Sequence, residues 1–379
     1  MRAINGKYNF ALIMCDDLEE SAEVQIKNIL DKNIFKDCQI RVMADVHAGK
    51  GCVVGLTISS NKYIVPNLIG VDGSCGLLSY NLGKINPDFE GLDDYIKTNI
   101  PSGFSVNPKP YHIIEKLKHT YLSLANKVYK EDKGSVEKVW LSCGSLGGGN
   151  HFVALNQDPE DNVWLTVHSG SRNFGLTTCN YHQNKAKELM RVFKIEDEYD
   201  EVEFLPIGYG AEEYLSDMTA IGSYAYLNRL SICCRIINEF FNISPVHELE
   251  HIHTVHNFVD HDGTIRKGAI SAHEGERLLI PISMRDGVIV GVGKGSKKWN
   301  HSAPHGAGRV MGRKVAKRTL SLDKFKSDMK DVWSSCVDED RLDESPMAYK
   351  TKEYILDAIG ETVDVQFVMK EIYNFKAKS

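Results

Sequence analysis

The chain has 379 residues, of which 42% are hydrophobic and 25% are charged, and its formal net charge is −6. This is the composition of an ordinary globular protein that can build a sizeable core. No apolar run approaches the roughly 20 residues of a membrane-spanning helix, and the N-terminus lacks the pattern of a secretory signal. The sequence therefore predicts a cytoplasmic protein without a membrane segment.

Strand-like and helix-like runs are intermixed along the chain without a regular βαβ alternation. This order favours an α+β fold with irregular mixed sheets surrounded by helices, organised as one domain over residues 1–379. Runs rich in Val, Ile and Leu predict strands at 40–43, 52–58, 76–82, 163–167, 278–282 and 287–292. Amphipathic runs predict helices at 22–34, 113–129, 180–193 and 212–241. Two polar, acidic stretches, 158–162 and 196–203, are predicted to be surface loops.

The nine cysteines form an odd set without any CxxC pair. Because nothing indicates export, we expect reduced thiols rather than disulfides, and no zinc ribbon. Most of these thiols are predicted to be buried as small apolar groups. Cys75 is the exception, because of the residues around it.

Glycine clusters lie beside chemically active residue types at 49–51, 70–76, 144–149, 170–175, 291–295 and 306–312. Turns usually combine Gly with Asn, Asp and Pro. Here the glycines accompany His, Asp, Cys, Arg or Lys, which indicates loops that converge on one site.

The run SAPHGAGRVMGR contains the candidate nucleophile, His305. Gly306 and Gly308 carry no Cβ, so the backbone can approach a phosphate closely. Arg309 and Arg313 are four residues apart and would share one face of a following helix. A neutral imidazole next to a phosphate-binding loop is suited to nucleotidyl or phosphoryl transfer.

Residues 294–318 contain eight Lys or Arg residues and no Asp or Glu. This bias indicates an anionic partner such as an RNA backbone. The alternative is a solvated basic surface helix, and the sequence leaves both interpretations open.

Candidate metal ligands occur in several of the glycine turns. Asp72 and Cys75 form a D-x-x-C turn that can place a carboxylate and a thiolate on one ion, although Cys75 can equally be a core thiol. Carboxylate suits Mn²⁺ or Mg²⁺, thiolate suits Zn²⁺, Fe²⁺ or Co²⁺, and imidazole bridges these preferences. Asp45 follows a short strand and can either act at the site or cap a turn.

The segment GGGNH, at Asn150 and His151, lacks the spacing of a Walker loop and of GxGxxG, which disfavours a P-loop or dinucleotide fold. His168 is predicted at the C-terminal end of a strand, where ligands tend to bind, with Arg172 in the Gly/Ser turn that follows. His151 considered alone is equally explained as a satisfied core histidine.

The segment HIHTVHNF supplies three histidines. Strand alternation puts His251 and His253 on one face and His256 on the other, so only part of this group can reach a single site. Lys267 precedes a glycine turn and is a candidate phosphate ligand. Four histidines are predicted to be structural or surface residues: His47, His251, His253 and His301.

Six motifs, in this order, resemble those of the RtcB-type RNA ligases: GVDGSCG, CGSLGGGNHF, VHSGSRNFG, VHNF, RKGA and HGAGR. The resemblance runs from about residue 40 to the C-terminus. It implies an RtcB-like fold with a central metal and nucleotide cleft. It also implies a GTP- and Mn²⁺-dependent RNA ligase that joins 2′,3′-cyclic phosphate or 3′-phosphate ends to 5′-hydroxyl ends, as in tRNA or rRNA fragments.

The resemblance implies a role for each matching residue. His305 would carry GMP covalently, and Asp45 would act as a base or orient a ligand. One Mn²⁺ would be bound by Cys75, His168 and His256, and a second by Cys75, Asp72 and His151. Nucleotide contacts would come from Asn150, His151, Phe152, Ser283, Met284, His305, Gly306, Ala307, Gly308 and Lys376. Phosphate or RNA contacts would come from Arg172, Lys267, Arg309 and Arg313.

The chain departs from the family pattern at three places near the nucleotide. Ala154 replaces an acidic residue, residues 281–287 read PISMRDG, and the C-terminus reads FKAKS, with Lys376 as the counterpart of the usual lysine. These changes indicate a divergent paralogue, expected to be a monomer. They leave two alternatives: an RNA-binding paralogue that no longer ligates, and a metal-dependent phosphatase or cyclic phosphodiesterase acting on RNA ends.

Overall fold

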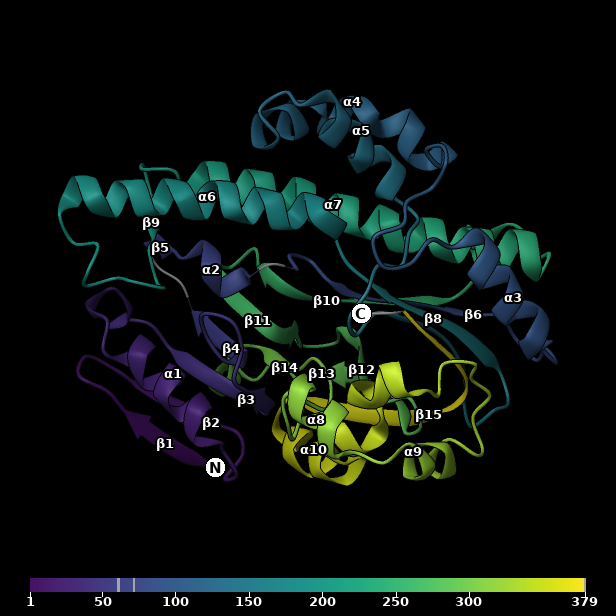
Figure 1. Ribbon diagram of the computed structural model, residues 1–379. Helices are drawn as coiled ribbons and strands as arrows, with labels where there is room; N and C mark the ends of the chain where they lie inside the picture. Colours follow the sequence, from purple (N-terminus) through teal and green to yellow (C-terminus); the bar gives the residue numbers. More distant parts are fainter. Residues whose placement is uncertain (60–61, 71, 378–379) are drawn as a thin grey trace.

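The computed structural model describes residues 1–59, 62–70 and 72–377 (Figure 1). Within them, a 13-stranded sheet forms the centre of the protein. Its main path runs β1 (Arg2–Asn5), β2 (Phe10–Ile13), β3 (Ile40–His47), β4 (Val54–Ser59), β11 (Thr264–Ser271), β10 (His251–Val259), β6 (Gly76–Asn81), β8 (Val163–Ser169), β7 (Phe152–Gln157), β15 (Val363–Lys376), β13 (Gly287–Gly293) and β12 (Arg277–Ser283). β14 (Ser302–Pro304) pairs with β11 off this path, and β5 (Tyr63–Ile64) pairs separately with β9 (Leu205–Pro206).

Neighbouring strands of the sheet come from distant parts of the sequence. β4 pairs with β11, β6 pairs with β10, and β7 pairs with β15, all antiparallel. The pair β2–β3 is parallel. This order carries the turns of several motifs to the middle of the sheet, so the expected α+β class with a mixed sheet is confirmed.

All six predicted strands are present, whereas β15, one of the longest, was not predicted. Its pattern is not an apolar run, because polar residues such as Glu371, Asn374 and Lys376 occupy buried positions on it. A strand that lines a polar site gives no simple alternation of apolar and polar residues.

Two long helices, α6 (Arg172–Phe193) and α7 (Ala211–Arg235), lie across one face of the sheet (Figure 1). On their outer side they are covered by α4 (His112–Val128) and α5 (Lys133–Ser142). α6 begins at Arg172, well before the predicted start at residue 180. The Gly/Ser-rich beginning of α6 reads as a turn in sequence, but Phe174 is buried in the core there.

The opposite face is covered by helices of the C-terminal third, α8 (Arg313–Thr319), α9 (Leu322–Asp328) and α10 (Lys352–Ala358) (Figure 1). The short helical turn η5 (Glu339–Glu344) contacts α8. Further helices are α1 (Glu20–Leu30), beside β1 and β2, α2 (Pro66–Ile69) and α3 (Phe89–Asn99). No helix of the described residues is both long and apolar enough to span a bilayer.

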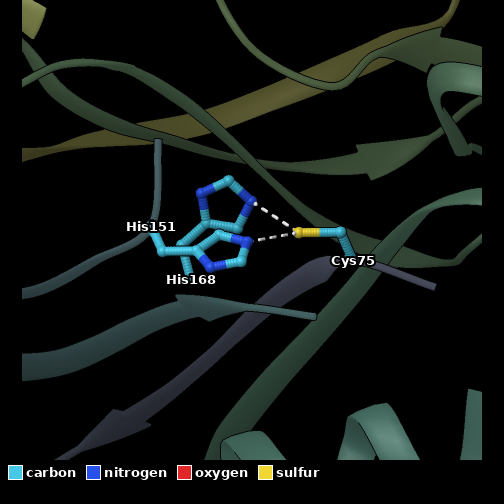
Figure 2. A group of neighbouring side chains, drawn as sticks. All are labelled: Cys75, His151 and His168. Atoms are coloured by element: carbon cyan, nitrogen blue, oxygen red, sulfur yellow. Dashed lines mark hydrogen bonds between the residues drawn. The ribbon is translucent and has the colours of Figure 1, made fainter. Parts of the chain in front are cut away.

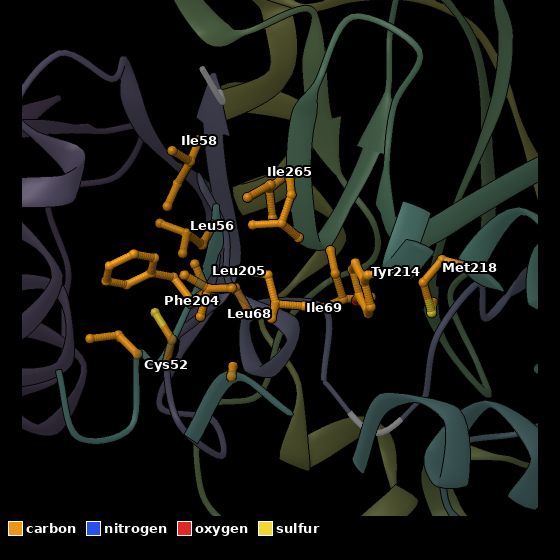
Figure 3. Packing of buried hydrophobic residues seen from close by; sticks show 14 of the residues in the cluster. Cys52, Leu56, Ile58, Leu68, Ile69, Phe204, Leu205, Tyr214, Met218 and Ile265 are labelled. Carbon is orange, nitrogen blue, oxygen red and sulfur yellow. The ribbon is translucent and has the colours of Figure 1, made fainter. Parts of the chain in front are cut away.

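The core between the sheet and the two long helices is continuous and apolar. Figure 3 shows Leu56 and Ile265 of the sheet beside Ile69 of α2 and Tyr214 and Met218 of α7. Burial of each such side chain contributes about 2 kcal/mol. This packing holds α7 rigidly against the strands, which matters because α7 also anchors the loops of the site.

Candidate functional site

A pocket of about 320 Å³ opens at the middle of the sheet, where the motif turns meet. It is lined by fourteen of the residues that the sequence analysis selected: Asp72, Asn150, Phe152, His168, His256, Ser283, Met284, His305, Gly306, Ala307, Gly308, Arg309, Arg313 and Lys376. Three more of them contact this wall: Asp45, Cys75 and His151.

Cys75, His151 and His168 form the centre of a cluster of metal-ligand types (Figure 2). The Cys75 Sγ lies 3.3 Å from the His151 Nε2 and 3.2 Å from the His168 Nε2. Cys75 immediately precedes β6, His151 immediately precedes β7, and His168 lies on β8. The central strands of the sheet thus bring these three side chains together.

Asp72 and His256 extend the cluster on two sides. The Asp72 Oδ2 lies 3.2 Å from the His151 Nε2, and the His256 ring centroid lies 5.4 Å from that of His168. The His151 Nδ1 lies 2.8 Å from the Leu146 carbonyl and donates to it, which directs Nε2 to the cluster. The Nδ1 of His256 is buried without a hydrogen-bond partner.

Burial controls the protonation of the cluster. It lowers the pKa of His168 and of His256 well below the ordinary value, so both imidazoles are neutral. It raises the pKa of the Cys75 thiol. Burial opposes ionisation of Asp72 as well, but His151 nevertheless holds the pKa of that carboxyl low. Neutral imidazoles, a carboxylate and a thiol that a cation can deprotonate fit a divalent transition metal.

Helix α7 anchors the loops that carry the ligand types. The Asn228 side chain accepts from the Gly144 backbone N–H at 2.8 Å and donates to the Ser169 hydroxyl at 2.9 Å. The fully buried Arg229 donates to the Ser74 carbonyl at 3.0 Å and to the Ser169 carbonyl at 2.8 Å. Neither residue stands out in the sequence, because a polar residue within an amphipathic helix normally faces water.

Replacing Arg229 by methionine is expected to lower the free energy of unfolding by about 3 kcal/mol, because two buried carbonyls lose their donor while the volume is kept. Urea denaturation monitored by circular dichroism measures this change. Arg191→Ala, on the exposed side of α6, is the control and should change stability by less than about 0.5 kcal/mol. Equal stability of the two variants would contradict an anchoring role.

His305 is oriented by Asp45, which is completely buried on β3. The Asp45 Oδ2 accepts from the His305 Nδ1 at 2.6 Å and from the His305 backbone N–H at 3.0 Å. The proton therefore sits on Nδ1, and the lone pair of His305 is on Nε2. Lys350 Nζ donates to the carbonyls of Ala44 and Val46 on either side of Asp45.

Two further features place His305 at the site. Its ring centroid lies 4.6 Å from that of His256, so it adjoins the metal-ligand cluster. Gly308 has a φ of +74°, and a Cβ there would lie 2.2 Å from the Asp45 carbonyl oxygen, so only glycine allows this approach. The alternative that Asp45 merely caps a turn is wrong, because it lies inside β3 with its carboxylate on His305.

The expected helix face shared by Arg309 and Arg313 is also wrong. α8 begins at Arg313, whereas Arg309 precedes the helix and forms an isolated antiparallel β-bridge with Tyr349. Both guanidinium groups nevertheless approach the buried Glu344, with Nη1 to Oε1 distances of 3.5 Å for Arg309 and 2.7 Å for Arg313. A carboxylate from another segment, rather than a helix, brings the arginines together.

The basic run 294–318 is partly compensated in the folded protein. Arg313 and Lys317 face Asp343, and Lys298 pairs with Glu361. These carboxylates lie outside the run, so the composition of the run does not reveal them. The run therefore carries less uncompensated positive charge in the folded protein than its sequence indicates.

Two candidate phosphate ligands lie outside the pocket. Lys267 is buried, and its Nζ donates to the Lys50 carbonyl at 2.6 Å. Arg172 binds the Ser145 hydroxyl and the Gly103 carbonyl, in a separate depression of the surface. Both side chains are held by tertiary contacts that the motifs do not reveal, and neither is among the residues that line the pocket.

Among the other residues that line the pocket are His47, Glu344, Tyr349, Glu371 and Asn374, none of which was selected from the sequence. Glu344 accepts a hydrogen bond from Lys376 at 2.9 Å. Burial raises the pKa of the Glu344 carboxyl, but the positive charges of Lys376 and Arg313 outweigh burial and hold that pKa below its ordinary value. Burial raises the pKa of Glu371 to about 8. His47 was predicted to be a structural or surface residue. Its Nδ1 lies 3.0 Å from the Asp45 carbonyl, a structural contact, and the residue also lines the pocket. Four of them sit in stretches without glycine clusters, whereas His47 lies beside the cluster at 49–51.

Comparison with known proteins matches this arrangement to one family. Residues 25–377 match the family described as "tRNA-splicing ligase RtcB". The chain is 29% identical over 371 residues to the "RNA-splicing ligase RtcB" of Escherichia coli (strain K12), which covers 89% of this chain and 90% of that protein. It is 27% identical over 396 residues to the "tRNA-splicing ligase RtcB" of Aeropyrum pernix, with 82% and 81% covered. The chain therefore belongs to the RtcB family of tRNA-splicing ligases.

Proposed function

We propose that this protein is an RNA ligase that joins 2′,3′-cyclic phosphate or 3′-phosphate ends to 5′-hydroxyl ends, with GTP and Mn²⁺, through a covalent His305–GMP intermediate. The observation that carries the proposal is the Asp45–His305 pair beside the metal-ligand cluster. A carboxylate on Nδ1 leaves Nε2 as a nucleophile and stabilises the positive charge that the ring gains on attack.

The first step is nucleotidyl transfer to His305. A bond forms between Nε2 and the α-phosphorus of GTP, the bond from that phosphorus to the bridging oxygen breaks, and pyrophosphate leaves. Where the RNA ends in a 2′,3′-cyclic phosphate, water first opens the ring by breaking the bond to the 2′-oxygen, which leaves a 3′-phosphate. An oxygen of that 3′-phosphate then takes GMP as the bond from phosphorus to Nε2 breaks, and attack by the 5′-hydroxyl on the 3′-phosphate joins the ends and releases GMP. Splitting the reaction into these steps lowers each barrier.

Asp72, Cys75, His151, His168 and His256 are the residues that would hold Mn²⁺. The metal would neutralise phosphate charge and align the reacting oxygens. Cys75 is central to this role, because its sulfur lies 3.3 Å from the His151 Nε2 and 3.2 Å from the His168 Nε2, close enough for one ion to bind all three atoms.

The nucleotide would lie along the pocket wall. Gly306 and Gly308 allow the backbone to approach the phosphates, and Arg309 and Arg313 supply charge there. Asn150, Phe152, Ser283, Met284 and Lys376 line the same pocket. Broken tRNA or rRNA would provide the two RNA ends.

Labelling with GTP tests the proposal. Protein loaded with Mn²⁺ is incubated with GTP labelled at the α-phosphate and is run on a denaturing gel with and without acid. An acid-labile labelled band, and joining of an RNA with a 2′,3′-cyclic phosphate end to one with a 5′-hydroxyl end, are expected.

Two other outcomes would favour the alternatives. Loss of the cyclic phosphate without GTP, and without joining, would indicate a metal-dependent phosphodiesterase. RNA binding without a labelled band, from protein shown to contain its metals, would indicate a paralogue that binds RNA and does not ligate.

A further inference from the structure

A second group of metal-ligand side chains lies at the turn between β10 and β11, outside the pocket that contains His305. It consists of Asp260, His261 and His273, whose ligand atoms lie within 4.8 Å of one another. The three residues line a surface depression that shares no lining residue with the pocket of His305. The proposed steps at His305 do not use this group.

The Asp260 carboxylate joins the two imidazole rings. The His261 Nδ1 lies 2.7 Å from the Asp260 Oδ1, and the His273 Nε2 lies 3.2 Å from the Asp260 Oδ2. The two ring centroids are 5.4 Å apart. Two imidazole nitrogens and a carboxylate oxygen therefore converge, which is a donor set that divalent transition metals prefer in proteins.

The backbone on both sides of the group is fixed by hydrogen bonds. The Asp260 N–H donates to the Thr264 carbonyl at 2.8 Å, which closes the turn that carries Asp260 and His261. The His273 N–H donates to the Glu276 carboxylate at 3.0 Å, and the His273 ring stacks on His301 with 4.8 Å between centroids. Ligands on such ordered segments lose little conformational freedom when they bind an ion.

The charges of the depression suit a cation. Burial opposes ionisation of Asp260, but the fully buried Arg266 donates to its Oδ2 and holds the pKa of this carboxyl below its ordinary value. The Asp260 Oδ1 accepts from the His261 N–H and keeps a second lone pair. Glu276 adds a further carboxylate, and no Lys or Arg is among the described residues that line the depression.

A small movement of one ring would complete the coordination. Ligand atoms on one tetrahedral ion lie roughly 3–3.5 Å apart, which is closer than the widest spacing in this group. His261 is 79% exposed, so its ring can change rotamer without displacing packed atoms. Each ligating ring would bind in its neutral form, with its proton on the nitrogen that faces away from the ion, and water would fill the remaining position.

We infer that Asp260, His261 and His273 form a second metal site, which binds Zn²⁺ or a similar divalent transition metal in preference to Mn²⁺. The preference follows from the order of stability of such ions with nitrogen ligands. The bound ion ties the β10–β11 turn to the segment that follows β11. Because β10 also carries His256, the ion stabilises the end of a strand that supplies the first cluster. The inference does not depend on the proposed function.

Zinc content tests the inference. Metal-free wild type, His261→Ala and His273→Ala are dialysed against the same buffered Zn²⁺ at a pH of about 8, where an ordinary imidazole is neutral. Elemental analysis then measures the bound zinc. Loss of one ligand should weaken this site at least about 100-fold, so each variant should retain about one ion fewer than the wild type.

Cobalt absorption distinguishes the second site from the cluster at Cys75. Co²⁺ bound to the Cys75 thiolate gives an intense sulfur-to-metal band in the near ultraviolet, whereas Co²⁺ on imidazole and carboxylate ligands gives only weak visible bands. His261→Ala should lose part of the visible absorption and keep the near-ultraviolet band. His119→Ala, which removes an exposed histidine of α4, is the control and should match the wild type in zinc content and in absorption.

The inference is overturned if His261→Ala and His273→Ala hold as much zinc as the wild type, or if His119→Ala loses an equal amount. His261→Ala should fold normally because its ring is exposed, so it decides the question even if His273→Ala does not fold. A GTP-labelled band with unchanged zinc content would reject the second site alone. Loss of zinc in His261→Ala from a protein that is never labelled by GTP would reject the proposed function alone.

Discussion

His305→Ala is expected to abolish the GTP-labelled band and to reduce RNA joining by about 10⁴-fold or more, as removal of a nucleophile does in other enzymes that use covalent catalysis. The physical reason is the arrangement of the ring. Asp45 holds the proton on Nδ1, and Nε2 is left with its lone pair in the pocket. Alanine removes that nitrogen. Phosphor imaging of a denaturing gel and a gel-based ligation assay measure the two effects.

His301→Ala is the matched control for this substitution. His301 lies four residues earlier in the same segment, does not line the pocket, and stacks on His273 with 4.8 Å between ring centroids. It should label and ligate as the wild type does. A labelled band that persists in His305→Ala would show that another residue is the nucleophile, and the proposed mechanism would have to be abandoned.

Cys75→Ala is expected to weaken Mn²⁺ binding by more than about 100-fold and to stop ligation. Loss of a residue that merely supports a ligand weakens metal binding by about 10–100-fold, so loss of a central ligand should exceed that range. Its sulfur contacts both His151 and His168, so its removal opens the cluster on both sides. Elemental analysis after dialysis against Mn²⁺ measures the bound metal.

Cys179→Ala is the control for removal of a buried thiol. Cys179 is 3% exposed on α6, and its thiol contacts the Pro66 carbonyl rather than the cluster. A bound metal stabilises the folded state by mass action, so Mn²⁺ should raise the melting temperature of the wild type and of Cys179→Ala but not of Cys75→Ala. Equal metal content in the two variants would exclude Cys75 as a ligand.

The sequence was a good guide to the strands and to the types of residue at the site. Strands such as β8 and β13 are apolar runs bounded by glycine turns, and this pattern depends only on local chemistry. His168, at the end of β8, and His256, on the buried face of β10, followed from strand periodicity. His305 was selected from the glycine loop that surrounds it.

Several assignments depended on contacts that no local pattern carries. Lys267 has the chemistry of a phosphate ligand, but the Lys50 carbonyl binds its ammonium group. Arg309 and Arg313 were expected on one helix face, and instead Glu344 gathers them. In each case the partner lies in a different segment, so the sequence of the motif alone cannot show it.

By itself the sequence determined the α+β class, the family, and the presence of a candidate nucleophile and a set of metal-ligand types, because periodicity and short motifs are local properties. The tertiary structure alone decided which groups act together. Asp45 and His305 are 260 residues apart in the chain. Glu371 and Asn374 face the pocket because of a β-bulge and a strand pairing. Such contacts arise from sheet order and packing, in which each residue's environment is set by segments distant in sequence.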